Sequence, residues 1–516
     1  MPESDSKVPA RTDPERFFRT EHLKADLKRR SIRGGAITIM AQISKLIMQF
    51  GSVVVIARLL TPEDYGLIGM VTVITGFISI FKDLGLSMAT VQREEITHTQ
   101  VSTLFWINVA ISGAIMVLTM VLAPVIAWFY GEPRLIGITL VLASGFIFGG
   151  LTVQHQALLK RQMRLTALAI IDIIAMLVSV GISLIFAILG TGYWALVVMQ
   201  LAMPIINFIG VWVSCGWRPG KPKIDSEVMP MLAFGGWNTG FTVVNYFTRN
   251  LDNLLIGKFW GADQLGLYAQ AYKLLVLPLQ QINFPLTTVA LPGLCSVQSD
   301  PQRYRSYYGK AVELMVMLGM PITVYMAVDA ERLIINLLGT QWSEAVLLFR
   351  ALAPVAFIST FNVATAWVFI SLGRADRQFH WNTFSSIITV IGFLIGVNWG
   401  ALGVAIAASI TFCGLRYPSI IYCFKSTPLT PEYLMEILWR PTMASLGAGG
   451  LFWISRQAWV WSINPFIEIL LNLGLYTLFY LLIWCILPQG LQKIIEIVQL
   501  FKELRFSRQK GGENHV

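Results

Sequence analysis

The chain has 516 residues, of which 55% are hydrophobic and only 13% are charged, and its mean hydropathy is +0.63. Soluble domains carry about 25% charged residues, so this composition excludes an ordinary water-soluble protein and predicts an integral membrane protein. The net charge of +10 is assigned to cytoplasmic loops and not to nucleic-acid binding, because the basic residues do not interleave with aromatic residues on a polar domain.

Apolar stretches of about 20 residues recur along the chain, and each is long enough to cross roughly 30 Å of hydrocarbon as a helix. We therefore expect an all-α polytopic fold with about fourteen transmembrane helices. The expected segments are 33–59, 66–90, 101–129, 135–158, 166–189, 192–216, 230–257, 264–294, 309–328, 346–372, 379–397, 400–424, 437–460 and 463–487. A basic arm, 1–32, precedes them, and a basic tail, 488–516, follows.

Lysine and arginine gather in alternate loops between these segments. The richer set includes the N-terminal region, with eight basic residues between Arg11 and Arg33, and the C-terminal tail. Basic loops stay on the cytoplasmic side of a membrane, so we expect both termini to be cytoplasmic.

Two polar stripes that lie 200 residues apart indicate a duplicated unit. Residues three and four apart share one face of a helix, and the first segment carries such a face. Its members are Thr38, Gln42, Lys45, Gln49 and Ser52. Adding 200 to each number gives Asn238, Thr242, Asn245, Arg249 and Asp252. The flanking residues keep this register, as Gly66 and Gly266 show.

The duplication predicts two six-helix lobes, 33–216 and 230–424, joined by a cytoplasmic linker, 217–229. Two extra transmembrane helices are expected in 425–487. A six-helix unit begins and ends on the same side, so the copies are parallel, an arrangement typical of alternating-access transporters. A repeated motif also supports the duplication, because R-x-x-R occurs at 161–164 and at 374–377, each time just before the fifth helix of a lobe.

Cationic side chains inside these helices are the candidate site residues. Lys45 lies near the middle of its helix, where a lysine costs about 2.5–3.5 kcal/mol, so it either lines a wet cavity or holds helices together. The same two alternatives apply to Arg249. Asp252, three residues later, either pairs with Arg249 or carries a proton. Lys273 either lines the cavity or snorkels toward the outer surface.

The charge of these residues points to an anionic cargo. Ammonium and guanidinium groups bind phosphates, and amides and hydroxyls bind sugars. The candidate sugar-binding side chains are Gln42, Gln49, Asn238, Thr242 and Asn245. Phosphate and sugar together indicate a lipid-linked glycan. We expect no catalytic residues, metal site or cofactor, since the five cysteines show no metal-ligand spacing.

Two segments carry a recognisable motif, ARLLTPEDYGL at 57–67 and DNLLIGKFWG at 252–261. Both resemble the corresponding segments of the polysaccharide exporters (Wzx-type) of the multidrug/oligosaccharidyl-lipid/polysaccharide superfamily. The resemblance covers about residues 30–425 and is closest to colanic-acid and lipopolysaccharide exporters. It implies a MATE-like fold and cavity cations, which carry over to Lys45 and Arg249.

The resemblance also implies a function and its partners. It implies a flippase that moves undecaprenyl-pyrophosphate-linked oligosaccharide across a bacterial plasma (inner) membrane for capsule, exopolysaccharide or lipopolysaccharide synthesis. The expected partners are the lipid-linked oligosaccharide, membrane lipids and other polysaccharide-assembly proteins, with no nucleic acid among them.

Two other functions remain open. A cation-coupled multidrug exporter of the same fold would carry buried acids in the N-terminal lobe, where the first helix has none and Asp172 stands alone. A membrane glycosyltransferase or polymerase would need catalytic acids on a sizeable aqueous loop. The longest outer loop expected here is only 329–345, so we expect a transporter and not an enzyme.

Overall fold

A computed structural model of the chain describes residues 27–82, 86–93, 96–223, 228–458, 464–493 and 495–496. Side chains are described within these ranges except in parts of some helices, including 27–41 and 228–245. The structure describes no strand in these ranges.

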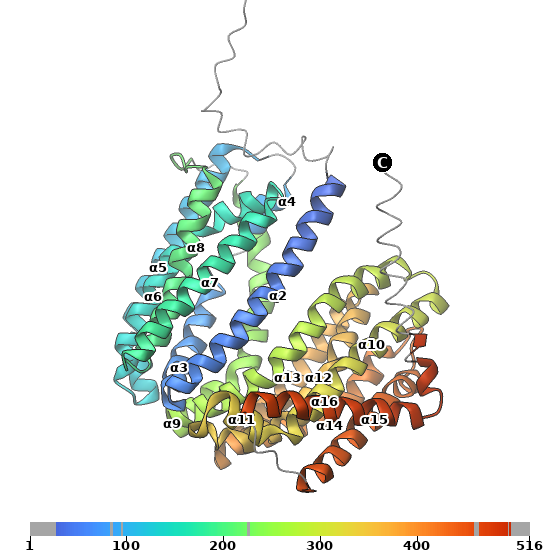
Figure 1. Ribbon diagram of the computed structural model, residues 1–516. Helices are drawn as coiled ribbons and strands as arrows, with labels where there is room; N and C mark the ends of the chain where they lie inside the picture. The colour runs from blue at the N-terminus through green and yellow to red at the C-terminus, as the bar shows by residue number, and fades with distance from the viewer. Residues whose placement is uncertain are drawn as a thin grey trace, which may run out of the picture. The chain divides into compact units, whose positions relative to one another are not determined.

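The described residues form α-helices joined by short turns (Figure 1). The helices of the first half are α2 (Leu27–Leu59), α3 (Pro62–Ser79), α4 (Leu86–Gln92), α5 (His98–Tyr130), α6 (Arg134–Arg161), α7 (Leu165–Ile188) and α8 (Trp194–Cys215). Those of the second half are α9 (Val228–Ser296), α10 (Pro301–Val328), α11 (Ala330–Leu338), α12 (Ala345–Ser371), α13 (Ala375–Gly396), α14 (Gly400–Phe424), α15 (Pro431–Ala458) and α16 (Pro465–Ile486), with short 3₁₀ helices η2 (Thr340–Trp342) and η3 (Val397–Trp399).

Nine helical segments among the described residues are long and apolar enough to cross a membrane. Two of them, Tyr246–Ser296 and Ala375–Phe424, have 51 and 50 residues. At 1.5 Å per residue, 50 residues span about 75 Å, more than twice the hydrocarbon thickness. Each is also interrupted by a glycine with positive φ, Gly261 at 82° and Gly400 at 76°. The chain is therefore an all-helical, multi-pass membrane protein, as expected, and the number fourteen stays a prediction.

Two expected segments differ in detail from the observed helices. The segment expected at 66–90 is divided, because α3 ends at Ser79 and the short α4 follows. The outer loop expected at 329–345 contains α11, which buries Leu333, Ile334 and Leu337 on one face. A nine-residue amphipathic helix has too little apolar length to register as a membrane span.

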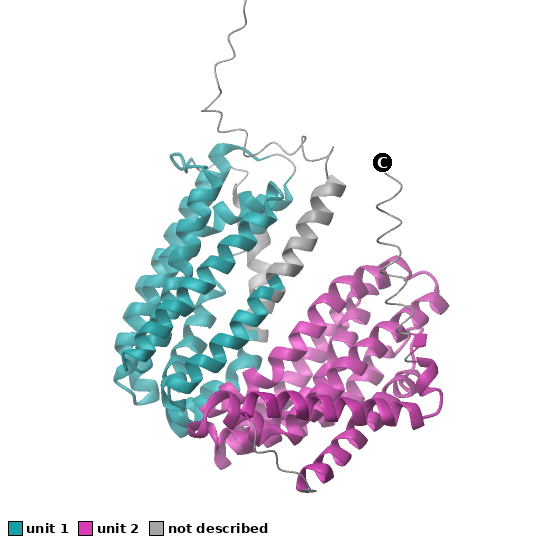
Figure 2. Cartoon of the chain, viewed as in Figure 1, with its two compact units in different colours: residues 1–266 teal, residues 267–516 magenta. Residues whose placement is uncertain are grey.

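The chain divides into two compact units, residues 1–266 and 267–516 (Figure 2). This boundary lies inside α9, whereas the repeat predicts a boundary at the linker 217–229. The start of that linker is held to unit 1, since Gly220 N donates to Ser102 Oγ at 2.9 Å and Trp217 is buried. The two compact units are defined by contacts and the two lobes by the sequence repeat, so their boundaries need not coincide. The lobes defined by the repeat stay a prediction.

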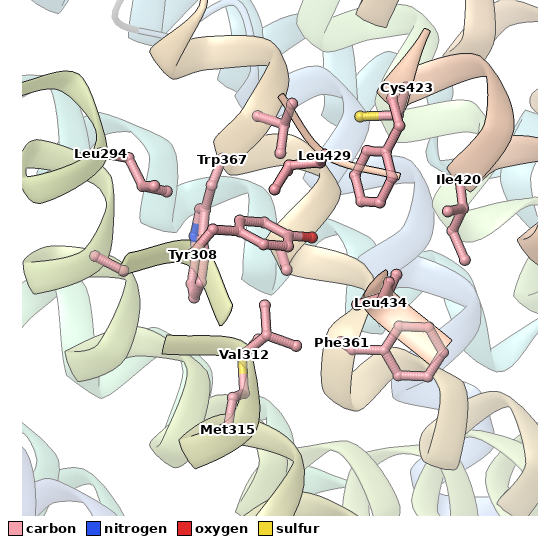
Figure 3. Packing of buried hydrophobic residues seen from close by; sticks show 14 of the residues in the cluster. Leu294, Tyr308, Val312, Met315, Phe361, Trp367, Ile420, Cys423, Leu429 and Leu434 are labelled. Carbon is pink, nitrogen blue, oxygen red and sulfur yellow. The ribbon is translucent and has the colours of Figure 1, made fainter. Parts of the chain in front are cut away.

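The hydrophobic core of unit 2 joins α10, α12, α14 and α15. Tyr308, Trp367, Ile420 and Leu434 come from these four helices and pack together (Figure 3). The last helix, α16, is fixed as well, because the Tyr480 hydroxyl donates to the Met317 carbonyl at 3.0 Å. The two C-terminal helices are therefore integrated into unit 2.

A reciprocal crossing of α3 and α9 in unit 1 gives the duplication a physical form. A Cβ added to Gly66 would lie 1.6 Å from the Ala262 carbonyl oxygen, and one added to Gly266 would lie 1.8 Å from the Pro62 carbonyl oxygen. The four positions, 62, 66, 262 and 266, are related by 200 residues. Only glycine permits backbones to approach this closely. The contact maps onto itself under the shift of 200, which supports the predicted repeat.

The repeated R-x-x-R motifs at 161–164 and 374–377 have a structural counterpart, but the equivalent arginines are not those that the aligned motifs predict. Arg164 and Arg374 each follow a residue with positive φ, 56° at Met163 and 66° at Gly373. Arg164 Nη1 donates to Ser214 O at 2.8 Å, and Arg374 Nη1 donates to Lys425 O at 2.7 Å. Each arginine thus binds the end of the last helix of its own repeat. The equivalent positions are 164 and 374, not 161 and 374, because the helix-ending turn fixes the alignment.

Candidate functional site

The side chain of Lys45 lies inside unit 1 between two helices. Lys45 Nζ on α2 is 2.5 Å from Asp172 Oδ2 on α7, and the two side chains are 28% and 36% exposed. Asp172 is the eighth residue of α7, about 10 Å from the start of that helix. The pair is therefore an intramembrane ion pair that is not sealed from its surroundings.

Two polar side chains on α2 lie next to Lys45 and are exposed. Gln42, one turn before it, and Gln49, one turn after it, are both exposed. Ser52 donates from Oγ to the Gln49 carbonyl at 2.9 Å. The side chain of Thr38 lies outside the described residues. An ammonium group flanked by two amides is chemically suited to an anion that carries sugars.

The second stripe is described only at its end. Arg249 is exposed, whereas Asp252 is 7% exposed and accepts a hydrogen bond at Oδ1 from Asn253 N at 2.8 Å. The side chains of Asn238, Thr242 and Asn245 lie outside the described residues. The proposed roles of these residues, and the pairing of Arg249 with Asp252, stay predictions.

The first part of α9 is held firmly within unit 1. The Tyr246 hydroxyl donates to the Val73 carbonyl of α3 at 2.7 Å, and Lys258 donates to the Phe129 carbonyl at the end of α5. Lys258 also lies 5.0 Å from the Phe129 ring centroid. These contacts fix the depth and rotation of the helix that carries Arg249.

Lys273 lies in unit 2, on the second part of α9. Its side chain is exposed. Its role as a cavity residue stays a prediction.

Other charged groups of unit 2 have partners that fix helices to each other. Asp329 is fully buried, forms an ion pair with Arg456, and accepts from Asn472 Nδ2 at 3.3 Å. Arg416 donates to Asn362 Oδ1 at 2.5 Å and is 7% exposed. Buried charges persist only when paired or hydrogen-bonded, so these groups have a structural role.

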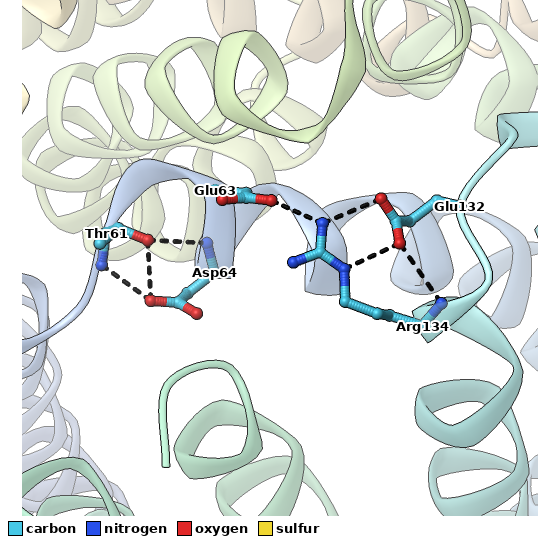
Figure 4. A network of polar contacts seen from close by, with 5 residues as sticks. All are labelled: Thr61, Glu63, Asp64, Glu132 and Arg134. Atoms are coloured by element: carbon cyan, nitrogen blue, oxygen red, sulfur yellow. Dashed lines mark hydrogen bonds and ion pairs between the residues drawn. The ribbon is translucent and has the colours of Figure 1, made fainter. Parts of the chain in front are cut away.

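A second polar network of unit 1 lies where α3 begins (Figure 4). Arg134 donates to both carboxylate oxygens of Glu132, at 2.8 and 2.9 Å, and to Glu63 at 2.5 Å. The side-chain hydrogen bond from Arg134 holds the pKa of the Glu132 carboxyl below its usual value. Thr61 and Asp64 cap the same helix start reciprocally. The network fixes the helix that carries Gly66 to the α5–α6 turn.

Sequence reasoning missed the partner of Lys45. Asp172 is separated from it by 127 residues. The available signal was that Lys45 and Asp172 are charges placed away from the ends of apolar segments, and such charges in lipid require a partner. The structure brings these two residues together, so the lone acid expected in the middle of the N-terminal lobe is the partner of Lys45.

Comparison with known proteins agrees with this architecture. A family model described as polysaccharide biosynthesis protein matches residues 55–347. The chain is 27% identical to the teichuronic acid biosynthesis protein TuaB of Bacillus subtilis (strain 168), over 64% of this chain and 68% of that protein. It is 23% identical to the lipopolysaccharide biosynthesis protein WzxC of Escherichia coli (strain K12), over 74% of this chain and 78% of that one.

Solved structures confirm the fold class. The chain is similar to the lipid II flippase MurJ in an inward closed conformation, with a TM-score of 0.71 and 15% identity over 88% of this chain and 98% of that one. It is also similar to an inward-facing multidrug resistance MATE family transporter, with a TM-score of 0.57 and 13% identity over 74% and 95% of the two chains. The expected MATE-like fold is therefore confirmed.

Proposed function

The chain belongs to the family of polysaccharide biosynthesis proteins, and from this membership we propose that it is the flippase that exports a lipid-linked oligosaccharide. The cargo is an undecaprenyl-pyrophosphate-linked glycan, and the membrane is a bacterial plasma membrane. The observation that carries the proposal is the partly exposed Lys45 ammonium within the helices of unit 1. A cation at this depth is costly in lipid and suits an anionic head group.

Transport proceeds by alternating access, in which the site opens first to the cytoplasm and then to the outside. The alternation of basic loops supports a cytoplasmic position for both termini. Lys45 and Arg249 bind the phosphates, and Gln42 and Gln49 bind sugar hydroxyls. The lipid tail stays in the bilayer.

The membrane potential favours this direction of movement. An interior-negative potential assists the outward movement of an anion by about 2.3 kcal/mol per charge per 100 mV. The potential assists transport if the cations stay in place while the pyrophosphate moves past them. It gives no net assistance if the cations move across the membrane together with the pyrophosphate, because their charges then cancel. Lys45 lies on α2, which packs against α7 within unit 1, and this packing favours the relay.

The charge balance at this site argues against a cationic drug as cargo. An exporter of cations needs an acid that attracts them, and the described partner of Asp172 is Lys45. An enzyme is also disfavoured, because the outer loop with room for catalytic acids is occupied by the packed helix α11.

Deletion of the gene in the bacterium that encodes it tests the proposal. One surface polysaccharide should disappear, and its lipid-linked repeat unit should accumulate on the cytoplasmic leaflet. Complementation with the wild-type chain should restore export, whereas Lys45→Met should not, at equal protein level. Unchanged polysaccharides together with increased drug sensitivity would instead establish a drug exporter.

A further inference from the structure

Asp172 has a feature that a purely structural counter-ion does not need, which is access to its surroundings. Its side chain is 36% exposed and that of Lys45 is 28% exposed. An ion pair of unit 2 with the same separation, Arg332 Nη1 to Glu468 Oε1 at 2.5 Å, is less exposed, at 23% and 12%. A ligand that reaches Lys45 therefore also meets Asp172.

The two pairs also differ in the chemistry of the cation. Arginine presents a planar fork that holds a carboxylate in a fixed geometry, whereas a lysine ammonium is a compact charge with three rotatable donors. The ammonium of Lys45 can exchange a carboxylate oxygen for a phosphate oxygen without a change in its own position. The Lys45–Asp172 pair is thus exchangeable, and the Arg332–Glu468 pair is suited to a permanent link.

We propose that Asp172 occupies the phosphate position of the empty transporter, so that the head group of the cargo must displace it from Lys45. This inference rests on the proposed function, because it takes Lys45 as the phosphate-binding group. A monophosphate ester carries a charge of about −1.5 to −2 at neutral pH, so its electrostatic advantage over the resident carboxylate is small. A diphosphate carries more charge and more acceptor oxygens, so it displaces Asp172 more readily. The pair therefore makes the site selective for lipid diphosphates over lipid monophosphates.

Binding to the purified full-length protein tests this inference, with farnesyl diphosphate and farnesyl monophosphate as probes. The wild-type protein should bind the diphosphate more tightly. Asp172→Asn removes the competitor and keeps the cation, so both probes should bind at least about tenfold tighter, as expected for the loss of one competing charged hydrogen bond. The monophosphate should gain more than the diphosphate, and equal gains would overturn the proposed selectivity. The matched variant Glu468→Gln should leave both affinities unchanged.

Contrary results would be clear. Unchanged or weaker binding by Asp172→Asn would overturn the competition. Asp172→Ser serves in its place if the Asn variant is not recovered folded, and failure of both beside a normal Asp172→Glu would make the pair structural. Export abolished by Asp172→Asn at a normal protein level would make Asp172 an obligatory group of the transport cycle, which also overturns the inference. The proposed function fails separately, through an unchanged polysaccharide in the gene deletion.

Discussion

The crossing of α3 and α9 provides the sharpest test of the fold. Replacing Gly66 by alanine places a Cβ 1.6 Å from the Ala262 carbonyl oxygen, where about 3 Å is needed. The obstacle is backbone, so no side-chain rotation relieves it and the helices must separate. Overpacking of this kind costs about 1–3 kcal/mol or more, against a gain of about 1 kcal/mol in helix propensity for alanine. Because a backbone atom cannot move aside, we take the upper end of this range, about 3 kcal/mol, and expect a net loss of about 2 kcal/mol.

Thermal unfolding of the purified protein in detergent measures this loss. In a unit as large as unit 1, a loss of about 2 kcal/mol should lower the Tm by about 4 °C. Gly266→Ala should behave like Gly66→Ala, because its Cβ would lie 1.8 Å from the Pro62 carbonyl oxygen. The double variant should lose less than the sum of the two, since one separation of the helices relieves both clashes.

Gly51→Ala and Gly181→Ala are the matched controls for this experiment. Both positions lie in helices, and a Cβ added at either has nothing within 4 Å. Each control should keep or slightly raise the Tm. A Tm of Gly66→Ala equal to that of the controls would refute the close approach of the two backbones.

Three further predictions address charged groups. Arg249→Ala should reduce glycan export without a loss of protein, and Asp252→Asn should reduce it less; a collapse of expression in Asp252→Asn would show a structural role. Asp329→Asn should destabilise unit 2 by about 3–5 kcal/mol, because it breaks a buried ion pair, and a Tm within 1–2 °C of wild type would contradict this. Because Arg134 lowers the pKa of Glu132, the stabilising contribution of their pair is present at neutral pH and lost below about pH 4.5. Its size should stay below about 1 kcal/mol, so the fall in Tm from pH 7 to 4 should be slightly larger in wild type than in Arg134→Gln.

Much of the architecture could be predicted from the sequence because the lipid bilayer imposes simple rules. A helix must bury its backbone polar groups internally and must be about 20 residues long, so apolar runs located the helices well. The rules fail for elements that do not cross the membrane. The amphipathic α11 carries no such signal and was missed as a helix, and the short α4 was expected only as the end of the segment 66–90.

The candidate site was harder to predict because its geometry is non-local. The sequence identified Lys45 as a costly residue that needed a polar environment, but helical spacing relates only residues three or four apart. Asp172 reaches it from the fifth expected segment, four segments later in the chain. The register of Arg161 and Arg164 was misaligned for a similar reason, since a positive φ at Met163 is not visible in the residue type. The equivalent position in the second repeat is Gly373, and glycine adopts a positive φ at the lowest cost.

The reciprocal contact of Gly66 and Gly266 also constrains how the two copies diverge. A contact that maps onto itself has the form of an isologous dimer interface contained in a single polypeptide. The obstacle at each glycine is a backbone carbonyl, so no side-chain change near 262 or 62 makes room for a larger residue, and glycine is expected to be kept at both 66 and 266 in related sequences. Elsewhere the copies have drifted freely, to an offset of 210 residues by Arg164 and Arg374. At this crossing the chain still keeps the symmetry of two identical halves.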